Sequence, residues 1–132
     1  MQEISKLRLG IDYGRKKVGL AKSDSFLAEP FRVVRGNSME ELVNNVWGII
    51  EKFKFLEIVV GVSDGEIAAE SRIFGKKLEL KSGVKVMFFD ETLTTNDAKE
   101  LAIAAGIKRK KRKHLEDAYA ATLILQNYLD SL

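Results

Sequence analysis

The sequence contains no cysteine, one proline and one histidine in 132 residues. Without cysteine the chain can form no disulfide framework, thiol nucleophile or cysteine-ligated zinc site. A histidine-based triad or histidine-rich zinc site within one chain is possible only around the single histidine, His114. Long apolar runs are also absent: no signal-peptide stretch opens the chain, and nowhere do about 18 consecutive apolar residues occur. We therefore expect a cytoplasmic protein.

The rest of the composition is that of an ordinary globular protein. Hydrophobic residues make up 45% of the sequence and charged residues 31%, which is enough apolar side chain to build a core. The length suits one domain and leaves little room for a second. We expect residues 1–132 to form a single domain.

The basic residues are unevenly distributed. The net charge is +3, from 22 basic and 19 acidic residues, and the segment "KRKKRK" at 108–113 alone supplies six basic side chains. Without this segment the chain would be acidic. A concentrated basic segment is typical of a site for a polyanion such as nucleic acid, although a solvated loop has the same composition.

The pattern of apolar residues predicts three short strands, over residues 7–12, 18–22 and 31–35, joined as a meander. An amphipathic helix follows within residues 37–53, and Ser38 with Glu41 forms a capping box at its start. Residues 57–62 and the segment from Val84 read as buried strands, separated by a helix over residues 66–80. Further helices are expected over about 94–106 and 115–129. This order predicts an α/β fold with a five-stranded mixed sheet flanked by helices.

Several carboxylates stand at the ends of these predicted elements. Asp12 ends the first strand, on the face opposite Leu9 and Ile11, while the others follow later strands or begin the last helix. These others are Asp64, Asp90, Glu91 and Asp117. If the strands are parallel, their carboxyl ends share one edge of the sheet. Clustered carboxylates favour Mg²⁺ or Mn²⁺, whereas the alternative is that Asp64 caps a turn and Asp90 merely ends a strand.

Four segments together resemble the YqgF family, also called RuvX, of Holliday junction resolvase-like nucleases. They are "GIDYGRKKVGLA", "IVVGV", "FFDETLTT" and "LEDAYAATLILQNYL", and the resemblance runs from Leu7 to Leu129. It implies a ribonuclease H-like fold and a metal-dependent nuclease linked to maturation of the 5′ end of the 16S ribosomal RNA precursor. Two alternatives are a Holliday junction resolvase acting on DNA and a non-catalytic nucleic-acid-binding module. The chain is too short for an actin-like ATPase, which closes two such lobes over its nucleotide.

The resemblance also implies roles for particular residues. Asp12, Glu91 and Asp117 match the acidic positions of the family motifs, which makes them the expected catalytic residues and ligands of Mg²⁺ or Mn²⁺. In related resolvases the second acidic residue ends the fourth strand, so Asp64 competes with Glu91 for that role. The chain departs from the family pattern at Thr92, where arginine is usual, and at Ser63, where proline is usual.

Two basic segments are the expected contacts to nucleic acid, because phosphate contacts position a strand without reading its sequence. The first is the turn after Asp12, although this turn could also be a solvated hairpin. The residues are Arg15, Lys16 and Lys17 in the turn and Lys108, Arg109, Lys110, Lys111, Arg112 and Lys113 in the later run. The sequence leaves open whether the substrate is precursor ribosomal RNA or branched DNA, and whether the protein is a monomer or a homodimer.

Overall fold

A computed structural model describes residues 6–90 and 109–132, with backbone alone for residues 109–117. Within these residues the chain forms five strands and three helices. In chain order they are β1 (Arg8–Asp12), β2 (Lys17–Ser23), β3 (Glu29–Arg35), α1 (Met39–Ile50), β4 (Glu57–Val62), α2 (Glu66–Ser82), β5 (Val86–Asp90) and α4 (Arg109–Asp130).

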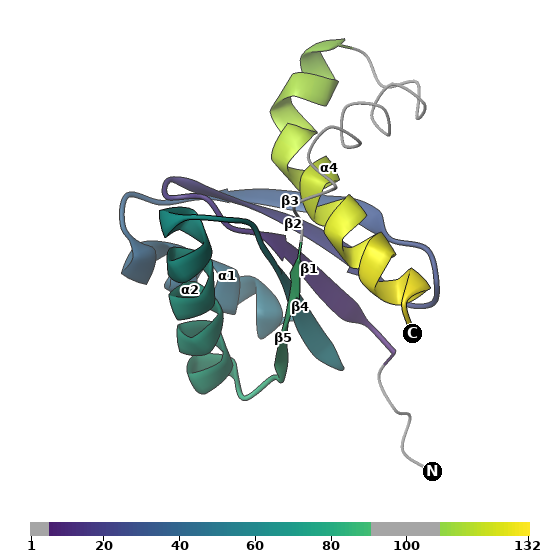
Figure 1. The fold of residues 1–132 in the computed structure, drawn as a ribbon, viewed down its shortest axis with the longest axis horizontal. Coiled ribbons are helices and arrows are strands. Elements are labelled where there is room, and N and C mark those ends of the chain that lie inside the picture. Colours follow the sequence, from purple (N-terminus) through teal and green to yellow (C-terminus); the bar gives the residue numbers. More distant parts are fainter. Residues whose placement is uncertain (1–5, 91–108) are drawn as a thin grey trace.

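The strands form one mixed sheet in the order β3-β2-β1-β4-β5. The first three strands are an antiparallel meander, and β1, β4 and β5 run parallel to one another. Helices α1 and α2 cover one face of the sheet and α4 covers the other (Figure 1). The predicted five-stranded mixed sheet is confirmed.

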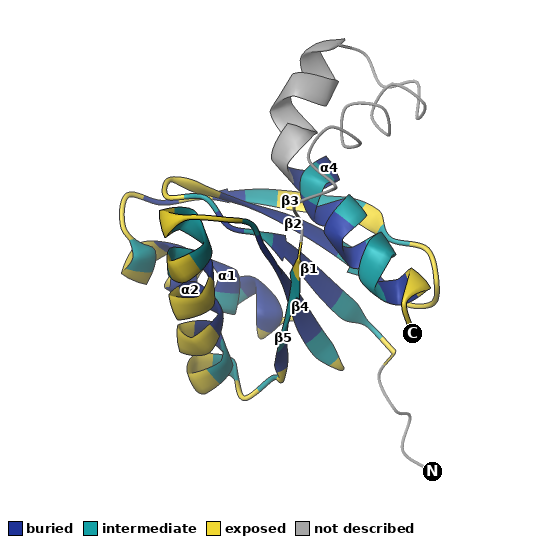
Figure 2. Ribbon diagram, in the orientation of Figure 1, coloured by how far each residue is buried: buried dark blue, intermediate teal, exposed yellow. Residues whose placement is uncertain are grey.

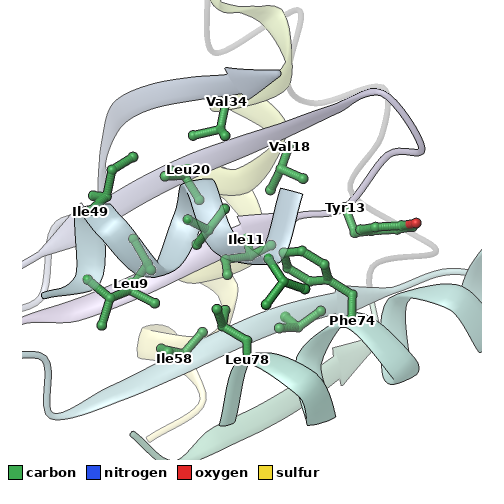
Figure 3. Close-up of a cluster of buried hydrophobic side chains, with 14 of the residues drawn as sticks. Leu9, Ile11, Tyr13, Val18, Leu20, Val34, Ile49, Ile58, Phe74 and Leu78 are labelled. Atoms are coloured by element: carbon green, nitrogen blue, oxygen red, sulfur yellow. The ribbon is translucent and has the colours of Figure 1, made fainter. Parts of the chain in front are cut away.

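The larger core lies between the sheet and helices α1 and α2. Leu9 and Ile11 of β1 are fully buried on this face, where Phe74 and Leu78 of α2 pack against them (Figure 3). The strands are buried along the centre of the sheet, whereas α2 is exposed along its outer side (Figure 2). Successive residues of β1 alternate between the two faces of the sheet, as the apolar period of two in the sequence predicted.

A smaller core lies between the sheet and α4. Its buried members are Ala21, Val59, Ala121, Ile124, Leu125 and Leu129. Gly10 of β1 is the point of closest approach, because a Cβ atom built there would lie 2.7 Å from the Leu125 Cβ and 3.0 Å from the Ala121 carbonyl oxygen. Helix α4 therefore sits directly on β1.

Local signals explain where α1 begins and where α2 ends. The Ser38 side chain accepts a hydrogen bond from the Glu41 backbone N–H at 3.2 Å, which confirms the predicted N-cap and satisfies one of the free amides of the first turn. Helix α2 ends at Ser82, and the capping residue Gly83 has a φ of 74°, the left-handed conformation that glycine adopts most readily.

One boundary differs clearly from the prediction. Helix α4 begins at Arg109 and not near Leu115, so five residues of the basic run have a helical backbone. The physical reason is that lysine and arginine have high intrinsic helix propensity, which a search for apolar periodicity does not detect. The predicted helix over residues 94–106 lies outside the described residues. In the part of the chain that the structure describes, no helix is both long and apolar enough to cross a membrane.

Candidate active site

Asp12 is the last residue of β1 and lies on the side of the sheet that α4 covers. Leu9 and Ile11 face α1 and α2, whereas Gly10 lies beneath α4, so the alternation of the strand places Asp12 on the same face as Gly10. The residue is half-buried. The sequence prediction that Asp12 stands opposite the main apolar face is confirmed.

Glycines flank Asp12 on both neighbouring strands. Gly19 of β2 pairs directly with Asp12. On the other side Ile11 pairs with Val60 of β4, and Gly61 is the next residue of that strand. Because Ala21 and Val59 pack toward α4, Gly19 and Gly61 share the face of Asp12. At the positions next to Asp12, the two neighbouring strands therefore carry glycine and no side chain.

The parallel strands bring their carboxyl ends to one edge of the sheet. Ile11 pairs with Val60, and Val62 pairs with Asp90 at the end of β5. Phe89 packs on the α4 side and Phe88 on the α2 side, so Asp90 faces the α2 side. The expected ligand Glu91 follows Asp90 immediately in the sequence but lies outside the described residues.

Helix α4 runs antiparallel to β1. Near its carboxyl end, Tyr128 donates a hydrogen bond of 2.6 Å to Glu57, the first residue of β4. One turn earlier Leu125 meets Gly10, and Ala121 meets the same glycine another turn back. Because α4 runs antiparallel to β1, the next turn carries the backbone of Asp117 toward the end of β1 at which Asp12 stands. Packing of α4 thus brings the backbone positions of Asp12 and Asp117 to the same end of the sheet.

Asp64 lies in a different environment. It lines a cavity of about 230 Å³ at the edge of the sheet, together with Arg72 of α2, Phe88 and Asp90. The Arg72 guanidinium carbon lies 5.3 Å from the centre of the Phe88 ring. Arg72 and Phe88 belong to the α2 side, whereas Phe89, which packs toward α4, also lines this cavity, so the cavity lies at the ends of β4 and β5. The choice between Asp64 and Glu91 as the second ligand stays a prediction.

The basic turn after Asp12 is held to α2. Arg15 donates from Nε and Nη2 to the Glu70 carboxylate at distances down to 2.7 Å, and the Tyr13 hydroxyl donates to the same carboxylate at 3.4 Å. The hydrogen bond from Arg15 lowers the pKa of Glu70, and it raises the pKa of Arg15 in turn. Lys16 and Lys17 are exposed. Arg15, one of the three predicted nucleic-acid contacts in this turn, is therefore paired with a carboxylate.

The other basic run is described only in part. Lys108 lies outside the described residues, and the remaining five residues of the run form the first turns of α4, where the structure gives the backbone alone. Their contact with nucleic acid stays a prediction.

Sequence reasoning missed Glu70. Arg15 and Glu70 are 55 positions apart, and nothing in the local pattern of α2 distinguishes Glu70 from the other acidic residues of that helix. The glycines beside Asp12 carried a weak signal, since Gly61 interrupts the β-branched run of β4 and Gly19 lies in the interior of β2.

The residues at this edge fit a hard divalent cation in donor chemistry, because the expected ligands are carboxylates. Among the side chains that the structure describes, no three His, Cys, Asp or Glu residues are gathered as a metal site. Two of the three expected ligands, Glu91 and Asp117, are not among those side chains.

Comparison with known proteins identifies the family. A family model described as "RuvX: Holliday junction resolvase" matches residues 6–131. A protein of Agathobacter rectalis named "Putative pre-16S rRNA nuclease" is 37% identical and covers 94% of both chains. A relative of the same name from Lactococcus lactis subsp. cremoris is 38% identical and covers 93% of both chains.

Among solved structures, RuvC of T. thermophilus in complex with a Holliday junction substrate has a TM-score of 0.63 at 21% identity and covers 95% of both chains. This likeness shows a shared ribonuclease H-like fold. Together with the family match over nearly the whole length, it leads to one conclusion: the chain belongs to the RuvX family of Holliday junction resolvase-like nucleases.

Proposed function

We propose that this protein is a divalent-metal-dependent nuclease that cleaves phosphodiester bonds in the 16S ribosomal RNA precursor, and that it acts in the cytoplasm as a single domain. The names of the curated relatives support the substrate. The structural observation that carries the proposal is the position of Asp12 at the carboxyl end of the central strand β1, with glycine on both neighbouring strands.

Asp12, Glu91 and Asp117 would hold the cation. Asp12 occupies the central position, because β1 lies between β2 and β4 and α4 crosses it. When bound, Mg²⁺ or Mn²⁺ activates a water for attack on phosphorus and neutralises charge on the leaving oxygen. Asp12 is half-buried, and the glycines at positions 19 and 61 would leave space for the cation and for the phosphate that the cation binds.

Basic residues on two elements would position the nucleic acid. Lys16 and Lys17 follow the end of β1, and residues 109–113 form the first turns of α4, which lead to Asp117. Both segments thus adjoin the elements that carry the expected ligands. Their ammonium and guanidinium groups bind the phosphate backbone, so binding should weaken steeply as salt concentration rises.

The experiment is cleavage of end-labelled 16S precursor RNA and of a four-way DNA junction by purified protein, with Mg²⁺, with Mn²⁺ and with chelator. We expect metal-dependent cutting of the RNA at the 5′ side of the mature sequence. Preferred cutting of the junction would instead assign junction resolution, the activity that the family description names. Binding of either substrate without cutting under any metal would overturn the nuclease and leave a binding module.

A further inference from the structure

We propose that Glu70 of α2 is a positioning residue for Asp12. It would act by holding the two residues that flank Gly14 in the turn after β1, so that the Asp12 carboxylate is fixed before the cation binds. The inference rests on the proposed function, because it concerns the same metal site. Glu70 is not one of the predicted ligands of that site.

The contacts converge on one carboxylate. Glu70 Oε1 accepts from the Tyr13 hydroxyl at 3.4 Å and from Arg15 Nε at 3.1 Å, while Oε2 accepts from Arg15 Nη2 at 2.7 Å. The guanidinium and the carboxylate thus meet as a two-pronged pair, which fixes orientation as well as distance. Tyr13 is the residue next to Asp12, so Glu70 is linked to the ligand through one peptide unit.

The rest of the turn is also fixed. Tyr13 is only 6% exposed, and its ring centre lies 5.0 Å from that of Phe74, one turn further along α2 than Glu70. A side chain at Gly14 would meet the Lys17 carbonyl oxygen at 2.7 Å, so the turn is tight. On the far side the Gly36 N–H donates to the Lys16 carbonyl at 3.0 Å. Glu70 is the polar anchor of this turn on the α2 side.

This arrangement matters because Asp12 is the final residue of its strand. Beyond Asp12 the sheet no longer holds the chain, and the direction of the Asp12 side chain depends on the backbone that follows. Partners that orient a metal ligand without touching the metal typically change metal affinity by about 10-fold to 100-fold when removed. Glu70 acts one step further from the ligand, through Tyr13 and Arg15, so we expect an effect at the lower end of this range.

The opposite interpretation is that Arg15 binds phosphate and that Glu70 merely competes for it. The Arg15 side chain is 61% exposed, so both interpretations are physically possible, but they predict opposite effects of removing Glu70. If Glu70 positions Asp12, its loss weakens metal binding. If Glu70 competes with substrate, its loss releases Arg15 and strengthens RNA binding.

The test compares Glu70→Ala with Glu66→Ala in the full chain. Glu66 is a matched control, because it lies one turn earlier on α2, is 91% exposed and only approaches Arg15 at 3.6 Å. Titration calorimetry with Mn²⁺ alone reports the metal site without turnover, and steady-state cleavage separates kcat from KM. Arg15→Lys keeps the charge but removes the two-pronged geometry, and Tm shows whether each variant is folded.

We expect Glu70→Ala to bind Mn²⁺ about 10-fold more weakly than the wild type, with lower kcat and unchanged KM. Arg15→Lys should shift Mn²⁺ affinity in the same direction, and the double variant should be no worse than Glu70→Ala. Equal Mn²⁺ affinity and kcat in Glu70→Ala and Glu66→Ala would overturn the inference, as would tighter RNA binding by Glu70→Ala in chelator. Failure of the wild type to bind Mn²⁺ would instead refute the proposed function itself.

Discussion

Adding one methyl group at Gly10 should test the packing that brings α4 to the end of β1. In Gly10→Ala the new Cβ would lie 2.7 Å from the Leu125 Cβ and 3.0 Å from the Ala121 carbonyl oxygen, whereas ordinary contact begins at 3.4 Å. Neither atom can rotate away, since one is backbone and the other is attached directly to it. Helix α4 must therefore move from the sheet by about 0.7 Å, the difference between 3.4 and 2.7 Å.

The expected cost follows from this displacement. Overpacking of a tight core typically costs about 1–3 kcal/mol. At about 4 °C per kcal/mol for a chain of this size, Tm should fall by about 4–12 °C. Because Asp117 lies on the displaced helix, kcat should also fall by about 10-fold or more, since an error of about 1 Å in a catalytic group can cost about 100-fold.

Thermal unfolding followed by circular dichroism, together with single-turnover cleavage, measures both effects. Gly48→Ala is the matched control: it adds the same methyl group within α1, where a Cβ meets no atom within 4 Å. This control should be as stable as the wild type or more so, because alanine favours a helix interior. Wild-type Tm and kcat in Gly10→Ala would refute the described contact between α4 and β1.

Three further outcomes follow from particular contacts. Ser38→Ala removes the cap of α1 and should lower the free energy of unfolding by about 1 kcal/mol in urea titrations, and an unchanged urea midpoint would contradict the role of the cap. Burial and the hydrogen bond to Glu57 raise the pKa of Tyr128 from 10.0 to about 12. Because the hydroxyl of the unfolded chain loses its proton at lower pH than that of the folded chain, the free energy of unfolding should decline as pH rises from 10.0 toward 12. Tyr128→Phe should flatten the decline of stability between pH 10.0 and about 12, and a slope identical to that of the wild type would contradict this role of Tyr128. Gly75→Ala places a Cβ 2.6 Å from the Phe88 ring and should lower Tm, while a wild-type Tm would show that the ring moves freely.

The sheet and helices α1 and α2 were predictable because their signals are local. Alternation in "RLGID" placed Asp12 opposite Leu9 and Ile11, and Ser38 with Glu41 marked the start of α1. The early start of α4 was not predictable from apolar periodicity, because its first turns contain charged residues that form helix by intrinsic propensity.

The surroundings of the site depend on contacts between distant residues. The pairing of Arg15 with Glu70 joins positions 55 apart, and an exposed arginine beside a strand end looks the same in sequence whether it binds phosphate or a carboxylate. The two candidates for the second ligand were likewise indistinguishable by spacing. Only the folded chain shows that Asp64 lines a cavity together with Arg72 of α2.

The most direct measurement of the central claim is metal-dependent cleavage of precursor RNA by Asp12→Asn beside Asp64→Asn. Each substitution removes one carboxylate charge at the same edge of the sheet, but Asp12 ends β1 on the α4 side, whereas Asp64 follows β4 and lines a separate cavity. Loss of cleavage in Asp12→Asn with near-wild-type cleavage in Asp64→Asn is the predicted result. Unimpaired cleavage by Asp12→Asn, or loss confined to Asp64→Asn, would contradict the placement of the active site at the end of β1.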